Sequence, residues 1–143
     1  MRIRVVIIGT ALASIALAGC VPAMTRHSPA VTGTLKLDGV PVAGARVFAN
    51  WNRDAACHES KVLSVTVTDK DGSFALPVGR AFEWYPLIVL GDYGYGWRLC
   101  FEYNAHSYLG IVDMGWGRPP ETFRVECDLS NDAHACKRLE GGT

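Results

Sequence analysis

Cysteine is the residue type in this 143-residue chain whose spacing most directly predicts chemistry. The chain has five cysteines, and one of them, Cys20, belongs to the N-terminal region. The other four are an even number, which in a chain exported from the cytoplasm predicts disulfides. The four that follow the N-terminal region are Cys57, Cys100, Cys127 and Cys136. They allow three pairings, and the sequence alone does not select one. The short polar stretch between Cys127 and Cys136 favours a local bridge, with Cys57–Cys100 as the second.

Zinc binding is the alternative chemistry for these thiols, because His58 adjoins Cys57 and His134 lies two residues before Cys136. The spacing contains no C-x-x-C element, and disulfide formation outside the cytoplasm competes for the thiols. We therefore expect two disulfides, no metal site and no cofactor.

The fifth cysteine, Cys20, follows a segment with the three parts of a secretory signal. A positively charged head (residues 2–4), an apolar run (5–17) and two small residues (18–19) precede it. The apolar run is too short to span a bilayer comfortably. We expect residues 1–19 to be a signal peptide that is removed.

This segment resembles the lipobox of bacterial lipoproteins, in which cysteine directly follows the cleavage site. The resemblance implies a diacylglycerol, with chains such as palmitate, on the Cys20 sulfur and an acylated N-terminus. Several acyl chains hold a protein at a membrane more firmly than one chain does. Val21, rather than Asp, implies in that family an outer-membrane lipoprotein facing the periplasm or the exterior. Residues 20–30 are then expected to form the lipidated N-terminus and a tether.

The length and charge of the chain indicate one domain that does not bind nucleic acid. Removal of residues 1–19 leaves 124 residues, the length of one ordinary domain. That chain carries 12 basic and 14 acidic residues. A nearly neutral chain has no electrostatic basis for binding nucleic acid.

The chain also lacks the patterns of common catalytic sites. No G-x-S-x-G motif occurs, and His106 and Ser107 are neighbours whose side chains point to opposite faces of a strand. The segment from Asp69 to Gly72 lacks the glutamate that closes a calcium loop. No spacing indicates that two carboxylates converge, and those considered are Glu83, Asp92, Glu102 and Asp113. We expect a protein that is not an enzyme.

Apolar and polar residues alternate with a period of two along most of the chain. Because successive side chains on a strand point to opposite faces, this alternation predicts half-buried β-strands. Turn signals such as Asp38-Gly39 and Asp71-Gly72 separate them. Together they predict an all-β, antiparallel β-sandwich domain over residues 31–129, followed by a polar tail, 130–143, pinned by Cys136. The seven or eight predicted strands are residues 31–37, 45–51, 63–68, 74–76, 87–90, 97–103, 108–112 and 122–129.

Two motifs within residues 31–78 resemble a known family. They are DGVPVAGARV, from Asp38 to Val47, and TDKDGSFALP, from Thr68 to Pro77. Their order and spacing resemble carboxypeptidase regulatory-like domains, relatives of the transthyretin-like and Cna-B-like sandwiches. The resemblance implies a transthyretin-like scaffold that stabilises, spaces or binds. The chain lacks the Tyr-Arg-Gly-Ser type ending of the hydroxyisourate hydrolases in that group. Some Cna-B-like sandwiches form an internal Lys–Asn isopeptide bond, but the last predicted strand contains no Asn that Lys36 could bond to. We therefore expect Lys36 to be an exposed strand residue.

Aromatic residues beside glycines are the remaining candidates for a binding site. Residues 91–97 and 115–117 are predicted to form glycine-aromatic loops, and exposed rings on such loops give a large contact area at small entropic cost. The alternative is that the rings close the ends of a small sandwich. The candidate binding residues are Trp84, Tyr93, Tyr95, Trp97 and Trp116.

These observations favour a non-catalytic lipoprotein of the cell envelope that recognises another envelope protein. The alternative is a lipoprotein that binds a small ligand or glycan through the aromatic loops, and an envelope hydrolase is less favoured. A flat apolar patch of rings would indicate a protein partner. A cleft of parallel rings flanked by Asn or Asp would indicate a sugar, and a His near a carboxylate in a cleft would indicate catalysis.

Overall fold

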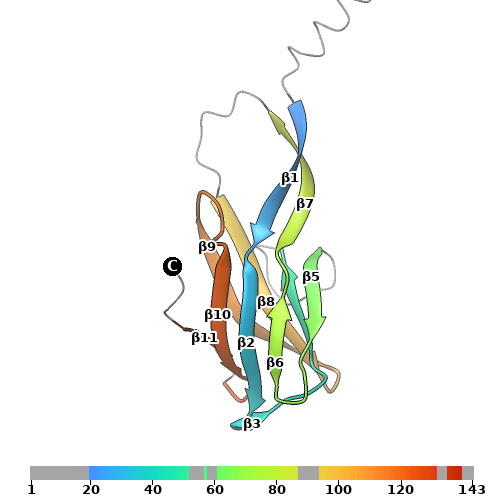
Figure 1. Ribbon diagram of the computed structural model, residues 1–143, viewed down its shortest axis with the longest axis vertical. Coiled ribbons are helices and arrows are strands. Elements are labelled where there is room, and N and C mark those ends of the chain that lie inside the picture. The colour runs from blue at the N-terminus through green and yellow to red at the C-terminus, as the bar shows by residue number, and fades with distance from the viewer. Residues whose placement is uncertain (1–19, 52–56, 58–60, 87–93, 132–134, 140–143) are drawn as a thin grey trace, which may run out of the picture. The chain divides into compact units, whose positions relative to one another are not determined.

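The segments in which apolar and polar residues alternate form β-strands. The computed structural model describes residues 20–51, 57, 61–86, 94–131 and 135–139 (Figure 1). These residues are all-β, with eleven strands and no helix. The strands are β1 (Cys20–Ser28), β2 (Ala30–Leu37), β3 (Val40–Pro41), β4 (Arg46–Asn50), β5 (Val62–Val67), β6 (Ser73–Leu76), β7 (Gly79–Pro86), β8 (Gly94–Tyr103), β9 (His106–Trp116), β10 (Thr122–Asp128) and β11 (Cys136–Arg138).

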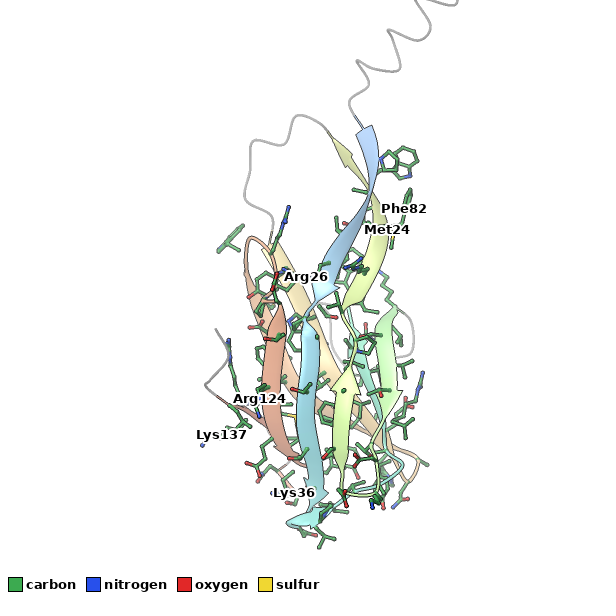
Figure 2. All side chains as sticks on the ribbon, in the orientation of Figure 1. Met24, Arg26, Lys36, Phe82, Arg124 and Lys137 are labelled. Carbon is green, nitrogen blue, oxygen red and sulfur yellow. A yellow bond between two sulfur atoms is a disulfide. The ribbon has the colours of Figure 1, made fainter. Side chains whose placement is uncertain are left out.

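The first sheet is built around β2. One edge of β2 pairs with β10 in parallel, and β11 continues the sheet beyond β10. The other edge pairs with β6 and, near its end, with β3. On this sheet, Lys36 Nζ of β2 donates a 2.7 Å hydrogen bond to Glu126 of β10 (Lys36 is labelled in Figure 2). The parallel pair joins segments from opposite ends of the sequence, so this sheet needs almost the whole chain to form.

The second sheet has the strand order β5-β4-β8-β9, and every pair in it is antiparallel. The inward-facing side chains of the two sheets form one core. Phe74 of the first sheet meets Phe101 of the second with ring centroids 5.8 Å apart, edge to face. The β2 backbone is crowded at Gly33, where a Cβ would lie 2.5 Å from the Val125 carbonyl oxygen. Two apolar faces thus pack against each other as a β-sandwich.

The predicted Asp-Gly turns are confirmed. Asp38 and Gly39 both have positive φ, 53° and 78°, as the two-residue turn between β2 and β3 requires. In the β5–β6 turn, Asp69 Oδ1 accepts hydrogen bonds of 2.9 Å from the backbone N–H groups of Asp71 and Ser73. The Asp69 carboxylate therefore takes the place of backbone carbonyl acceptors for these two N–H groups.

Several predicted elements are corrected by the structure. Residues 21–29, predicted as a tether, lie almost entirely in β1, which pairs with β7. The strand tolerates Pro22 because both strands of this two-stranded sheet are edge strands. The predicted polar tail contains β11, which the Cys127–Cys136 bridge holds in register with β10. The β2–β10 pair is parallel, not antiparallel. The predicted strand 87–90 lies outside the described residues.

The chain divides into two compact units rather than one domain with a tether. The sandwich unit comprises Arg26–Ala81 and Asp92–Thr143. The second unit comprises Met1–Thr25 and Phe82–Gly91, and its described residues are 20–25 of β1 and 82–86 of β7. In the described part of the chain, no helix is long and apolar enough to cross a membrane.

Asp128 links two turns of the sandwich. Its carboxylate accepts hydrogen bonds from the backbone N–H groups of Asp38 (3.1 Å), Gly39 (3.0 Å) and Ser130 (3.0 Å), and from the Ser130 hydroxyl (2.6 Å). The Ser130 hydroxyl, followed by the Ser130 amide, contributes most to holding the pKa of Asp128 below its usual value, and the Gly39 and Asp38 amides add to this effect.

We predict that Asp128→Asn lowers the free energy of unfolding by about 1 kcal/mol near neutral pH, because a neutral acceptor replaces a charged one in a solvent-screened site. Folding lowers this pKa, so the carboxylate stabilises the fold above its unfolded value of about 3.9. That stabilisation is lost as the pH falls through the lower pKa of the folded state. Urea unfolding from about pH 7 to about pH 2 measures both effects. A difference that does not shrink in acid, or an equal loss in the control Asp71→Asn, would contradict the prediction.

The β8–β9 turn places two residues other than glycine in the left-handed region. Asn104 has φ 49° and Ala105 has φ 62°, between the paired residues Tyr103 and His106. The right-handed twist of a hairpin favours two positive φ values here, and glycine is the preferred second residue. A Cβ in this conformation costs about 1–2 kcal/mol.

We predict that Ala105→Gly raises the free energy of unfolding by about 0.5–1 kcal/mol, because relief of this strain exceeds the entropy that glycine adds to the unfolded chain. Chemical denaturation measures the change. Ala75→Gly, at an exposed position of β6, is the matched control and should lower stability by a similar amount. A less stable Ala105→Gly protein would show that the turn is not strained.

Candidate functional site

The outer face of the second sheet carries a row of exposed apolar side chains on its edge strand, β9. This strand contains a bulge: Leu99 pairs with Ile111, whereas Cys100 pairs with Leu109. The extra residue is Gly110, and it faces the core, where a Cβ would collide with buried side chains. The bulge shifts the alternation by one residue. Apolar residues on both sides of it therefore share the outer face.

This row, which we call the recognition strip, consists of Leu109, Val112, Met114 and Trp116. Trp116 is 81% exposed and Met114 is 66% exposed. The residues opposite them on β8 are glycines, Gly94 facing Trp116 and Gly96 facing Met114. A Cβ at Gly96 would lie only 3.4 Å from Met114 Cγ, so Met114 covers this glycine. The result is a row of exposed apolar side chains along β9, with Arg98 of β8 opposite Val112.

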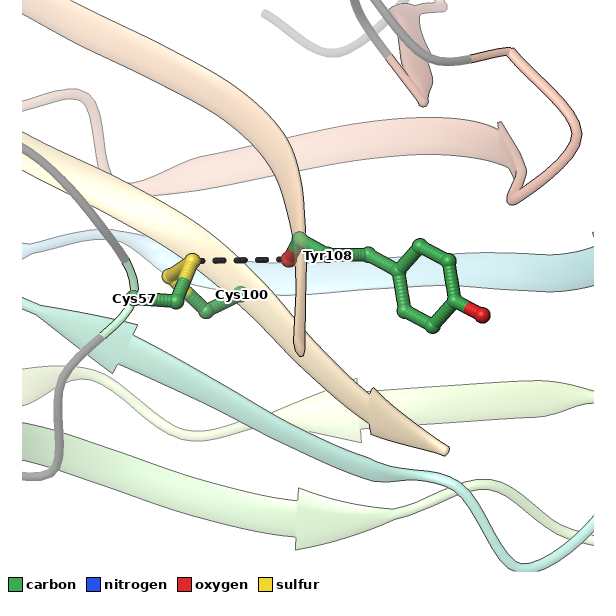
Figure 3. Close-up of a disulfide and its surroundings, with 3 residues drawn as sticks. All are labelled: Cys57, Cys100 and Tyr108. Atoms are coloured by element: carbon green, nitrogen blue, oxygen red, sulfur yellow. Dashed lines mark hydrogen bonds between the residues drawn. A yellow bond between two sulfur atoms is a disulfide. The ribbon is translucent and has the colours of Figure 1, made fainter. Parts of the chain in front are cut away.

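The middle of the same face is covered. Cys57 is bonded to Cys100, and the Cys57 sulfur lies 3.4 Å from the Tyr108 carbonyl oxygen (Figure 3). This is a close contact, since a disulfide sulfur carries no proton. Phe48, opposite Cys100 on β4, is fully buried although it faces outward, and the Arg46 guanidinium lies 5.1 Å from its ring centroid. The exposed apolar side chains of this face thus lie at its edges.

At the same ends of β8 and β9, the inner face of the sheet contains a hydrogen bond within a cluster of aromatic side chains. Trp97 Nε1 donates a 3.2 Å hydrogen bond to Asp113 Oδ2, and the Trp97 and Phe123 rings meet edge to face at 5.2 Å. Burial raises the pKa of Tyr95, and the charge of Asp113 and a hydrogen bond to it raise this pKa further. Only 1% of Trp97 is exposed. This cluster closes one end of the core.

The predicted aromatic binding residues therefore separate into two groups. Trp116 and Trp84 are exposed, the first on the recognition strip and the second in the β1–β7 unit. Of the two predictions for Trp97, exposure on a loop is wrong and closure of an end of the sandwich agrees with its burial. Trp97 lies within β8, because Gly94 and Gly96 before it belong to the strand. Tyr95 is half-buried beside it, and Tyr93 lies outside the described residues. The described rings of this cluster do not stack in parallel, since those of Trp97 and Phe123 are inclined by 87°.

The favoured pairing of the cysteines is confirmed. Disulfides join Cys57 to Cys100 and Cys127 to Cys136. The second pair are direct partners in the β10–β11 register, so the bridge crosses two adjacent strands.

The residues considered for catalysis do not gather into one site among those described. His106 Nδ1 lies 2.8 Å from the Asn104 carbonyl oxygen of its own turn. Glu102 accepts a 2.8 Å hydrogen bond from Arg46 on the outer face, while Asp113 accepts from Trp97 on the inner face. Glu83 accepts from Thr25 in the β1–β7 unit, and Asp92 lies outside the described residues.

Sequence reasoning missed three residues of the recognition strip: Leu109, Val112 and Met114. A signal was present, since Val112, Met114 and Trp116 are spaced by two with Asp113 and Gly115 between them. The prediction of a glycine-aromatic loop ended the strand at residue 112 and concealed this alternation. A bulge at Gly110 cannot be read from spacing alone.

No model of a known protein family matches the chain. A search of curated protein sequences finds no significant match.

Proposed function

We propose that this protein is a non-catalytic lipoprotein of the bacterial outer membrane, anchored through Cys20, that binds another envelope protein through the recognition strip. The observation that carries the proposal is Trp116, an 81% exposed tryptophan at the end of a row of apolar side chains on one strand. An exposed apolar row with a tryptophan is typical of protein recognition, whereas a cleft of parallel rings would favour a sugar.

The chemistry of the strip constrains its partner. All four side chains are uncharged, and tryptophan and methionine are enriched at protein interfaces. A charged group placed against Met114 and Trp116, which lie opposite glycines on β8, would lose water without gaining a partner. We infer that the partner offers an apolar, uncharged patch, and that binding therefore persists at high salt.

The two disulfides support export. Such bonds persist outside the reducing cytoplasm, and four of the five cysteines are used in them. Cys20 is the remaining thiol, placed where the lipobox resemblance implies acylation. The motifs from Asp38 to Pro77 add support, since the family that they resemble provides scaffolds for binding.

Site-specific photo-crosslinking tests this function. A photoreactive amino acid replaces Trp116 in cells that export the full chain, and Lys70, in the exposed β5–β6 turn, is replaced as the control. We expect one discrete protein adduct from position 116, none from position 70, and loss of the adduct when Met114→Asp is added. The same adducts from both positions, or an adduct that Met114→Asp does not affect, would exclude the strip as the binding surface.

A further inference from the structure

Residues 20–25 of β1 and 82–86 of β7 form a ribbon with one polar and one apolar face. Thr25 Oγ1 of β1 donates a 3.3 Å hydrogen bond to Glu83 Oε2 of β7, so these two side chains share one face. Because side chains alternate along a strand, Met24, Phe82 and Trp84 lie on the opposite face. Figure 2 labels Met24 and Phe82 on the paired strands.

This apolar face is exposed. Met24 and Trp84 are each 64% exposed and Phe82 is 58% exposed. The Phe82 and Trp84 rings contact each other edge to face at 5.9 Å. A two-stranded ribbon has no core of its own and is marginally stable in water. Three large apolar side chains exposed together on one face indicate a surface that another apolar layer covers.

The position of the ribbon in the chain indicates what covers it. The apolar segment 1–19 ends where β1 begins, at Cys20, and Met24 lies four residues further along the same strand. At about 3.3 Å per residue, Met24 is within about 13 Å of the Cys20 backbone. Any membrane attachment at Cys20 holds Met24 within the reach of the lipid headgroups. Amphipathic elements bury an apolar face about 5–10 Å into the headgroup–acyl boundary, and tryptophan concentrates there.

We propose that Met24, Phe82 and Trp84 insert into the interfacial layer of the membrane that holds Cys20. The apolar face adds a second contact to the lipid anchor and fixes the ribbon at the bilayer surface. This inference rests on the membrane attachment in the proposed function, but it assigns different residues from the recognition strip.

Fluorescence quenching by brominated lipid tests the insertion. The full protein, as isolated from the envelope, is reconstituted into phosphatidylcholine vesicles, with and without phosphatidylcholine brominated near the glycerol backbone. Four tryptophans contribute to the signal, so the difference between the parent and Trp84→Phe isolates Trp84. We expect the brominated lipid to reduce the Trp84 component at least about twofold, because an interfacial indole lies beside the bromine atoms. Trp116→Phe is the matched control, since it removes an exposed tryptophan outside the ribbon and should leave the quenching of the Trp84 component unchanged.

Mass spectrometry of the same sample separates this proposal from the proposed function. An acylated Cys20 with unquenched Trp84 overturns the insertion and leaves the anchor intact. An unacylated chain removes the proposed anchor. Because the other four cysteines are bridged, Cys20 is then coupled to a maleimide lipid in the same vesicles and the quenching is measured again. A photoreactive residue at position 82 that captures protein rather than lipid also overturns the insertion.

Discussion

Replacing Trp97 with alanine is expected to destabilise the protein by about 3–5 kcal/mol, while the same change at Trp116 leaves stability within about 0.5 kcal/mol of the parent. Trp97 is buried against Phe123, and its loss leaves a cavity and removes the hydrogen bond to Asp113. The side chain of Trp116 is mostly in solvent, so its removal exposes no core.

Urea unfolding followed by circular dichroism measures both variants without relying on tryptophan fluorescence. Binding to the envelope protein identified by crosslinking gives the second readout, and Trp116→Ala should weaken it about tenfold or more if this ring is a dominant contact. Trp97→Phe, which keeps a ring but loses the indole N–H group, should be less destabilising than Trp97→Ala. A Trp116→Ala protein as unstable as Trp97→Ala would show that Trp116 supports the fold rather than binding a partner.

Removing the Cys57–Cys100 disulfide by replacing both cysteines with alanine is expected to cost about 4 kcal/mol of unfolding free energy, and removing Cys127–Cys136 about 2.5 kcal/mol. The two bridges close chain segments of 43 and 9 residues. A longer closed loop restricts the unfolded chain more, so its loss has the larger effect. The longer bridge also holds Cys57 against the outer face of the second sheet.

Urea midpoints of the two double-alanine variants give these costs, and double-serine variants of the same pairs control for the choice of replacement residue. The order of the two effects is the critical result. If the Cys127–Cys136 variant were the less stable protein, the entropy of the unfolded chain would not be the main contribution of these bridges. The β10–β11 contact would then be the more important constraint.

The alternation of side chains made the strands of the sandwich predictable. The core residues of β2, β4, β6 and β10 follow a strict period of two, and the Asp-Gly turns mark where the chain must take positive φ. The disulfide pairing could be favoured because the segment between Cys127 and Cys136 is short and polar. These features are local, and a window of ten residues contains the information for each.

The strands rich in glycine could not be predicted in this way. Gly94, Gly96 and Gly115 suggested loops, because glycine is unfavourable in an isolated strand. In the folded chain, long side chains on the neighbouring strand use the space that they leave, Met114 over Gly96 and Tyr95 beside Gly115. The sequence predicts a tether at residues 21–29 for a similar reason, since their pairing partner lies more than fifty residues away in β7.

The all-β class and the main turns could be predicted from the sequence, because each depends on the conformational preferences of neighbouring residues. The four bridging cysteines could be predicted from their even number. Which rings are buried and which are exposed depends on the tertiary structure. Trp97 and Trp116 have similar glycine neighbours in the sequence, yet one faces the core and the other faces solvent. Register and the bulge at Gly110 fix which face each side chain takes, and both depend on pairing between strands that are distant in the sequence.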